Sequence, residues 1–439
     1  MHNISSGNTL RLKRRIPRYN PTPMRPPRAL AVLLPLFLVL GARADGPEPV
    51  ATITQGELSA HVKFLSSDEF KGRESGTPEG DRTAKYVADL FKEYGLKPLG
   101  DGQGAERRFH QKFRLPDGRE ASNLIGMIEG TDPAKKKECL VIGAHHDHVG
   151  LGHFGSKDSG GEGQIHNGAD DNASGTASLL ELAQAFVAAP ARRSLVLMSF
   201  AAEEKGLLGS KHYCENPALP LGTIVTMINL DMVGRSKGGY LFVGGLGTGT
   251  LLKSIVDRHN KEFRFQLEEK PGGMGPSDFE PFYRKDVPVL FFFTNVHEDY
   301  HRPGDDWEKV NFEAQEKITR LTYKVARDLL DGAGRPKFQE DDSQALPDSM
   351  LGRRGPVLGV ELVKTDQGEL AISEVRAKSA AEKAGLKQGD VLLALGKDRI
   401  DSQDTLQRLL STKKVNDVVS VKVRRKTKTL IFNVKLRAP

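Results

Sequence analysis

Carboxylate and imidazole side chains follow four apolar runs of this sequence. The runs have the composition of buried β-strands and span residues 139–144, 194–200, 224–230 and 287–294. The groups that come directly after them are His145 to His148, the pair Glu203 and Glu204, Asp231, and the segment at 299–305. Carboxylate oxygens and imidazole nitrogens suit zinc, and a buried carboxylate without a partner is costly. This clustering at strand ends therefore predicts a metal centre.

The order of strands and helices indicates how these groups would meet. Helical patterns lie before, between and beyond the apolar runs, at residues 55–66, 80–94, 174–187, 206–214, 250–261 and 312–330. Unbroken apolar strands that alternate with helices predict an α/β fold with a largely parallel sheet covered on both faces. Sites in such sheets form at the carboxyl ends of the strands, so we expect the metal-binding groups to share one edge.

Three other features have simple interpretations. Ser174 precedes a predicted helix and has no base placed beside it by the sequence, so helix capping is favoured over a nucleophilic role. The segment GGLGTG at 244–249 lacks the lysine and the spacing of a nucleotide-binding loop, and it predicts a turn. The sequence contains no HExxH, the motif of many mononuclear zinc proteases.

The first 44 residues have the pattern of a secretory signal peptide. They hold eight Lys or Arg and no Asp or Glu, an apolar run at 29–40, and the small residues Ala42 and Ala44 ahead of a cleavage point before Asp45. Translation could also start at Met24. The apolar run is shorter than the ~20 residues of a membrane-spanning helix. We therefore expect export to the periplasm or the extracellular space, with no membrane span after cleavage.

Overall charge and cysteine content exclude further classes. Residues 1–44 account for all of the net charge of +7, so composition gives no reason to expect nucleic acid as a partner. The two cysteines, Cys139 and Cys214, are too few for a disulfide-dense scaffold. They either pair in an oxidising compartment or remain free thiols.

Five motifs carry a resemblance to a known family. They are AHHDH at 144–148, NGADDNASG at 167–175, AAEEKGLLGS at 201–210, INLDMVG at 228–234 and EDYHRPGDD at 298–306. In this order they resemble the secreted di-zinc aminopeptidase family, which includes glutamate carboxypeptidase and the transferrin receptor ectodomain. The resemblance covers roughly residues 58–330 and implies a di-zinc peptidase domain at 45–331 with a zinc-exopeptidase-like, mixed and largely parallel sheet.

The resemblance also implies roles for individual residues. Two co-catalytic zinc ions would be held by five ligands: His145 and Asp231 on one ion, Glu204 and His301 on the other, and Asp171 bridging both. Glu203 would be the general base that takes a proton from the attacking water. Asp147 would lie behind His145 and fix its tautomer, and Tyr300 would stabilise the oxyanion.

Neighbouring residues are expected to play lesser parts. Asp170 precedes the bridging position and is expected to make structural hydrogen bonds. His146 is expected to line the pocket. His148, His153 and His166 lie in or beside the glycine-rich stretch at 150–168, which is expected to form a mobile wall of the site; these histidines need not bind metal.

The C-terminal part of the sequence differs from the rest in composition and pattern. A linker is expected at 332–354, and residues 355–439 contain 17 Lys or Arg against 10 Asp or Glu. The stretch SAAEKAGLKQGDVLL at 379–393 resembles a PDZ domain of the bacterial periplasmic kind, a small antiparallel β-domain. The resemblance implies a carboxylate-binding loop at 356–360 and a groove helix at 402–410, which would bind a C-terminal peptide. A packing role on the enzyme is the equally weighted alternative.

Together these resemblances imply an exported zinc exopeptidase. The favoured activity is that of an aminopeptidase, which removes N-terminal residues from peptide substrates by attack of a metal-bridging water. One alternative is a carboxypeptidase or deacylase on the same di-zinc centre. Another is a non-catalytic protein that binds partners through its PDZ domain. A glutaminyl cyclase is disfavoured because that branch uses one zinc.

Overall fold

The computed structural model describes most of the chain. The described residues are 48–158, 160–347, 357–365, 369–400, 405–406, 409–410, 413 and 416–437. The predicted signal peptide at 1–44 and the end of the predicted linker at 348–354 lie outside them, as does most of the predicted groove helix at 402–410. Among the described residues, every helix is too short or too polar to cross a membrane.

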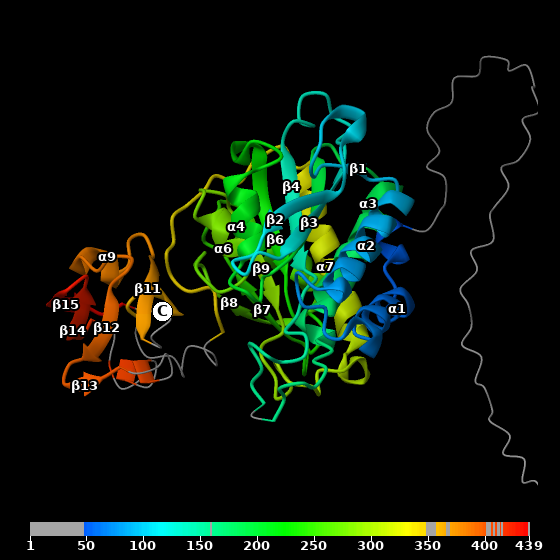
Figure 1. Ribbon diagram of the computed structural model, residues 1–439. Helices are drawn as coiled ribbons and strands as arrows, with labels where there is room; N and C mark the ends of the chain where they lie inside the picture. Colours follow the sequence, from blue (N-terminus) through cyan, green and yellow to red (C-terminus); the bar gives the residue numbers. More distant parts are fainter. Residues whose placement is uncertain are drawn as a thin grey trace, which may run out of the picture. The chain divides into compact units, whose positions relative to one another are not determined.

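The described residues before 348 form a nine-stranded sheet (Figure 1). Along the sheet the strands are β1 (Lys97–Pro98), β3 (Glu120–Ile128), β5 (Ser194–Phe200), β4 (Cys139–His145), β6 (Ile224–Leu230), β9 (Val289–Phe293), β7 (Tyr240–Gly244) and β8 (Gln266–Glu269), with β2 (His110–Arg114) paired to β3. The four central strands β5, β4, β6 and β9 are parallel to one another, and β3 and β7 flank them in antiparallel orientation. The largely parallel sheet predicted from the sequence is confirmed.

Helices cover both faces of this sheet (Figure 1). In β4, Leu140 and Ile142 pack into one core, and Val141 packs into another. The first core includes α1 (Gln55–Leu65), α2 (Pro78–Glu93), α3 (Gly175–Ala188), α5 (Leu252–Phe263) and α7 (Phe312–Asp331). The second core includes α4 (Leu208–Glu215) and α6 (Phe279–Tyr283). Because successive strand side chains point to opposite faces, a strand covered on both sides must be apolar throughout.

Strands β1, β2, β3, β7 and β8 were not predicted from the sequence. β3 carries the polar side chain of Asn123 in its interior, which obscures the apolar pattern. Asn123 is fully buried, and its side chain donates to Gly209 O at 2.8 Å and accepts from Ala201 N at 3.1 Å. The amide thereby holds both ends of the loop that follows β5, the loop that carries Glu203 and Glu204.

Part of the predicted linker lies against the peptidase domain. Met274 and Gln344 form a parallel β-bridge, and Ala345 N donates to Met274 O at 2.7 Å. Ala345 and Leu346 are buried. Composition suggested a linker because this segment has little periodicity; its contacts are made largely by the backbone, which leaves few marks in a sequence.

The PDZ part has its own sheet and core. Its strands are β10 (Val360–Lys364), β11 (Leu370–Val375), β12 (Val391–Leu395), β13 (Asp398–Arg399), β14 (Val418–Arg425) and β15 (Lys428–Lys435), with the short helix α9 (Ala380–Ala384). All pairings among these strands are antiparallel. Asp390 is fully buried and accepts two hydrogen bonds from Arg425, at 2.6 and 2.7 Å. Although desolvation opposes it, Arg425 holds the pKa of Asp390 below its ordinary value.

We predict that Asp390→Asn destabilises the PDZ part by about 1–3 kcal/mol, because the charge-assisted hydrogen bonds to Arg425 are lost. The pKa of Asp390 is depressed in the folded state, so its contribution should be complete above an unfolded pKa of about 3.9 and disappear as the pH falls further. Hydrogen exchange of residues 385–395 in the full chain at pH 7 measures the effect. Asp398→Asn on exposed β13 is the control, and equal exchange in both variants would contradict the prediction.

Candidate metal centre

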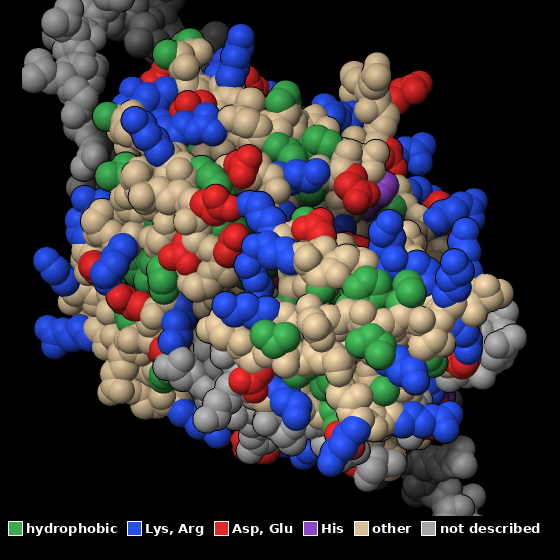
Figure 2. Space-filling view, turned by 90° about the vertical axis from the view of Figure 1, so that its left-hand side faces the viewer, with side chains coloured by type: hydrophobic (Ala, Val, Ile, Leu, Met, Phe, Trp, Pro, Cys, Tyr) green, Lys and Arg blue, Asp and Glu red, His purple; other side chains and the backbone are tan. Residues whose placement is uncertain are grey.

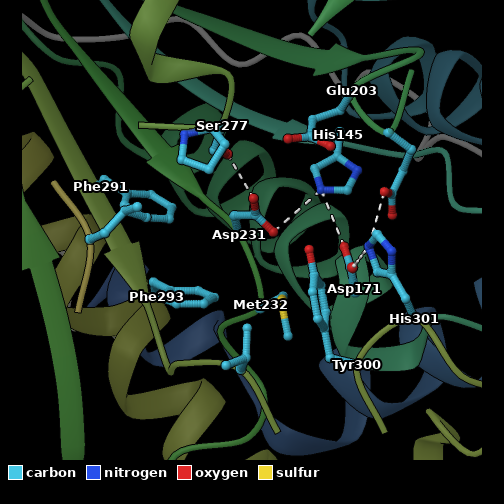
Figure 3. A pocket seen from close by; sticks show the side chains of 14 residues that line it. His145, Asp171, Glu203, Asp231, Met232, Ser277, Phe291, Phe293, Tyr300 and His301 are labelled. Carbon is cyan, nitrogen blue, oxygen red and sulfur yellow. Dashed lines mark hydrogen bonds and ion pairs between the residues drawn. The ribbon is translucent and has the colours of Figure 1, made fainter. Parts of the chain in front are cut away.

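A pocket opens where β4, β5 and β6 end (Figure 3). It contains the five predicted ligands together with Glu203 and Tyr300. The full lining is His145, Asp171, Glu203, Glu204, Asp231, Met232, Pro276, Ser277, Phe291, Phe293, Val296, Tyr300, His301 and Leu346. Thus the structure brings together predicted ligands that lie as far apart in the sequence as His145 and His301.

Asp171 stands between two sets of ligand atoms. Its Oδ1 lies 3.4 Å from His145 Nε2, and its Oδ2 lies 3.1 Å from His301 Nε2. His145 Nε2 is 3.3 Å from Asp231 Oδ1, and His301 Nε2 is 3.0 Å from Glu204 Oε2. Ligand atoms bound tetrahedrally at 2.0–2.1 Å from zinc are about 3.3 Å apart. The spacing therefore fits two neighbouring zinc positions that share Asp171.

The electrostatics of the cluster also suit a cation. Within the described part of the chain, His301 Nε2 is buried without a hydrogen-bond partner, although two carboxylates lie close to it. Desolvation lowers the pKa of His301, but Glu204 and Asp171 outweigh it and raise the pKa to about 11. Asp231 likewise helps to raise the pKa of His145 well above its ordinary value. The donor set thus forms a metal-binding cluster whose negative potential favours positive charge.

The segment that carries Asp171 is held by two buried charged residues. Asp305 Oδ2 accepts from the backbone N–H of both Asp170 and Asp171, at 3.0 and 3.1 Å. Arg73 is almost fully buried and donates to the carbonyls of His146 and Gly168 at 3.1 and 2.8 Å. Burial lowers the pKa of Arg73 only to about 10, so it remains charged. Arg73 could not be identified from sequence patterns, because its partners are backbone carbonyls, most of them far away in the chain.

Asp231 is oriented by a pair of side chains that the sequence analysis also missed. Ser277 Oγ donates to Asp231 Oδ2 at 2.6 Å, and Asn229 Nδ2 donates to Ser277 Oγ at 2.7 Å. Asp231 Oδ1 is left facing His145 (Figure 3). Hydrogen bonds of this kind fix the direction of a ligating carboxylate.

Glu203 and Asp147 occupy adjoining places. Burial raises the pKa of Glu203 well above its ordinary value; His145 opposes the rise, and Glu204 and Asp231 add to it. The Asp147 carboxylate accepts from Glu203 N at 3.1 Å and lies 3.7 Å from His145 Nδ1. His145 Nδ1 instead meets the backbone carbonyl of Asp147 at 3.2 Å. The backbone carbonyl of Asp147 is thus nearer to His145 Nδ1 than its carboxylate is, and the role of the carboxylate in fixing the tautomer stays a prediction. The carboxylate also accepts from the Glu203 backbone.

Tyr300 points its hydroxyl into the pocket (Figure 3). Burial and the nearby carboxylates raise its pKa, which keeps the hydroxyl protonated as a donor. The ring lies under the Lys157 ammonium, 3.7 Å from the ring centroid. His301 Nδ1 donates to Gly155 O at 2.8 Å, and Lys157 N donates to His301 O at 2.9 Å. The glycine-rich stretch therefore packs against the outer side of His301.

Neighbouring residues differ in how far they match expectation. His146 does not line the pocket, contrary to expectation: its Nδ1 lies 2.9 Å from Ser199 Oγ on the buried side, and burial lowers its pKa to about 3. Asp170 is confirmed as a structural hydrogen-bonder, since Oδ1 accepts from Gly234 N at 2.6 Å. Ser174 holds the N-cap position of α3, but its hydroxyl donates to the carbonyl of Asp170. His148, expected beside a mobile wall, is fully buried next to Glu204.

The thiols of Cys139 and Cys214 are both free and buried. Each belongs to the core that contains α4 and α6. Burial raises the pKa of both thiols, to about 11 for Cys139, so neither is an activated nucleophile at neutral pH.

Two arginines, Arg235 and Arg284, are paired with carboxylates and do not line the pocket, whereas the Lys157 ammonium lies over the Tyr300 ring. Arg235 donates to Asp299 at 3.0 Å, and Arg284 donates to Glu280 at 2.7 Å. Among the described residues that line the pocket, none is Lys or Arg. On the face shown in Figure 2, Lys and Arg side chains lie among Asp and Glu side chains and form no continuous basic band.

Known families and proteins are similar to both parts of the chain. Residues 123–326 match the model of peptidase family M28, and residues 356–436 match that of the PDZ domain. Aminopeptidase YwaD of Bacillus subtilis is 25% identical over 311 residues, which cover 65% of this chain and 64% of that relative. The chain thus spans slightly less than two thirds of that relative's length.

Solved structures share the fold of the first part. A zinc-dependent exopeptidase from Parabacteroides distasonis superposes with a TM-score of 0.54 at 19% identity, covering 63% of this chain and 98% of that one. A glutaminyl cyclase from Bacteroides thetaiotaomicron gives 0.53 at 19% identity, with the same two coverages. At such identities the likeness shows the fold alone, and one fold can support different reactions. The chain therefore carries a peptidase family M28 domain followed by a PDZ domain.

Proposed function

We propose that this chain is a zinc-dependent aminopeptidase that removes N-terminal residues from peptides. The observation that carries the proposal is the division of Asp171 between two ligand pairs, with Glu203 beside them. The names of the family and of the Bacillus subtilis relative support the same activity. The proposal includes two zinc ions, one at His145 and Asp231 and one at Glu204 and His301, because each oxygen of Asp171 faces a separate histidine.

Residues of the chain supply the rest of the chemistry. Zinc ions bound at this cluster would polarise the scissile carbonyl and lower the pKa of the attacking water. The Glu203 carboxylate would take the proton from that water and deliver it to the leaving amine. The Tyr300 hydroxyl would donate a hydrogen bond to the carbonyl oxygen as negative charge develops there. Asp147 would hold the Glu203 backbone in position throughout.

The charge around the pocket favours an aminopeptidase over a carboxypeptidase. A substrate ammonium group would find carboxylates in the pocket, whereas a substrate carboxylate would find no Lys or Arg among the described residues that line it. A carboxypeptidase or deacylase remains the second candidate, because its metal chemistry would be the same. A purely binding role would leave the complete ligand set without a use.

We predict that the mature protein cleaves peptides with free N-termini and spares N-acetylated ones. Chelation should abolish cleavage and zinc should restore it.

Glu203→Gln should lower kcat by roughly 10²–10⁴-fold because proton transfer is lost. Zinc content should be unchanged, since Glu203 is not among the proposed ligands. Glu162→Gln on the exposed loop is the control. Cleavage of acetylated peptides at equal rates would instead favour the carboxypeptidase or deacylase, and inactivity of zinc-loaded protein would favour a binding role.

One wall of the pocket is apolar and lies on the other side of the pocket from the ligands (Figure 3). It is made by Met232, Phe291, Phe293, Val296 and Leu346. We propose that this wall contacts the first side chain of the substrate and selects an apolar residue. Leu346 is 3% exposed and comes from the segment that leads towards the PDZ domain. That segment would therefore help to set specificity.

We predict that Leu346→Ala enlarges the pocket at this wall and shifts the substrate preference towards larger N-terminal residues. The ratio of kcat/KM for phenylalanine amide over leucine amide should rise by about tenfold, a typical value for a small change of pocket volume. Leu251→Ala, at a residue that is 48% exposed, is the control and should leave the ratio unchanged. An unchanged ratio in Leu346→Ala would place the first side chain elsewhere.

We also propose export to the periplasm or the extracellular space, on the sequence of residues 1–44. The PDZ domain is proposed to bind the C-terminus of a peptide. Export predicts that a tagged full-length chain is recovered outside the cytoplasm, with Asp45 as its first residue by N-terminal sequencing. Recovery in the cytoplasm, with residues 1–44 retained, would contradict export.

A further inference from the structure

His148 contacts Glu204, one of the residues proposed to hold the second metal ion. It is fully buried, and its Nδ1 lies 2.7 Å from Glu204 Oε1. The other oxygen, Glu204 Oε2, lies 3.0 Å from His301 Nε2. The two oxygens of one carboxylate thus face two different histidines. No role of His148 follows from the ligand set described above.

The distances indicate that His148 donates a hydrogen bond and does not ligate the metal. Two ligands of one tetrahedral zinc ion are about 3.3 Å apart, whereas the 2.7 Å between Nδ1 and Oε1 is typical of a charge-assisted hydrogen bond. Asp171 Oδ2, which belongs to the same proposed metal position, is 3.8 Å from Nδ1. A carboxylate only accepts hydrogen bonds, so the proton of this contact is on His148 Nδ1.

The position of the ring is fixed by close packing. A side chain at Gly168 would come within 2.5 Å of His148 Cδ2, so glycine is required there to make room for the ring. The ring also meets that of His301 edge-on, with centroids 5.4 Å apart. Within the described residues His148 Nε2 has no hydrogen-bond partner, so the contact with Glu204 is the polar interaction that the imidazole makes there.

We propose that His148 is a positioning residue for Glu204. Its Nδ1–H holds Oε1 and thereby keeps Oε2 turned towards His301 and Asp171, in the direction of the second metal ion. Without this bond the flexible glutamate side chain would lose a favoured orientation, which weakens the ligand it provides. The inference rests on the proposed di-zinc function and deepens it. The end of β4 and the segment that follows it then serve both metal positions, one through His145 and the other through His148.

The test is the affinity of the full-length protein for zinc, measured by metal content and by competition with a chelator. His148→Leu removes the donor at similar volume, and one of the two zinc affinities should fall by roughly 10–100-fold while the other stays unchanged. His153→Leu is the matched control, because His153 is exposed and pairs only with Glu162 among the described residues. Unchanged affinities at both sites in His148→Leu would overturn the proposal.

A second comparison does not depend on the folding of the leucine variant. His148→Asn places an amide N–H near the Nδ1 position, whereas His148→Gln places it near Nε2. The proposal requires that, at the zinc site of Glu204 and His301, the asparagine variant have at least tenfold higher affinity than the glutamine variant. Equal losses in these two variants would contradict it.

Cobalt substitution separates positioning from ligation. If His148 only positions Glu204, X-ray absorption of the cobalt-loaded asparagine variant should show the same number of nitrogen ligands as the wild type. Loss of one nitrogen ligand would make His148 a ligand and overturn the proposal. If the wild type itself binds fewer than two zinc ions, the proposed di-zinc function fails, and this outcome is distinct from equal affinities in wild type and variants.

Discussion

The structure of the first domain depends on the concentration of negative charge at one edge of its sheet. Ligand atoms of Asp171 and Glu204 lie within 4.8 Å of each other, as do those of Glu203 and Asp231, and all four residues line one largely buried pocket. Like charges at such distances repel strongly where little water can screen them. Neighbouring groups stabilise individual carboxylates: Ser277 donates to Asp231, and the imidazoles of His145 and His301 lie beside the two oxygens of Asp171. The remaining imbalance is what a divalent cation would neutralise.

This charge can be gathered because the strands that deliver it are themselves uncharged. β4, β5 and β6 are buried along their whole lengths, and Asp, Glu and His side chains appear only where they end. Parallel strands place these ends side by side, so residues from three separate segments meet without any long loop having to reach inwards. The loops are then fixed individually, by Asn123 after β5 and by Arg73 and Asp305 at the segment of Asp171. The charged centre is therefore preorganised by neutral strands and by buried polar anchors.

The same arrangement separates reaction chemistry from selectivity. The ligand atoms and Glu203 occupy one side of the pocket, and aromatic and aliphatic side chains occupy the other (Figure 3). Two solved structures with this fold carry the names of different activities, a zinc-dependent exopeptidase and a glutaminyl cyclase. The fold by itself consequently does not specify a reaction; the ligand set and the pocket wall do. Here that wall includes Leu346, which lies beyond the last helix of the peptidase domain.

Residue types and short motifs were sufficient to predict which groups could bind metal, which strands carry them and that a PDZ domain follows. These features are local, because residue type, hydrophobic period and short motifs can be recognised without knowing which distant residues are in contact. Three contacts became known only from the tertiary structure. The two oxygens of Asp171 face different histidines. His146 faces the core while His148 contacts Glu204, and Leu346 lines the pocket. Arg73 shows the reason. Its partners are carbonyl groups, which any residue possesses, and those of His146 and Gly168 lie more than 70 positions away. Contacts of this kind depend on packing geometry and leave no pattern in the order of side chains.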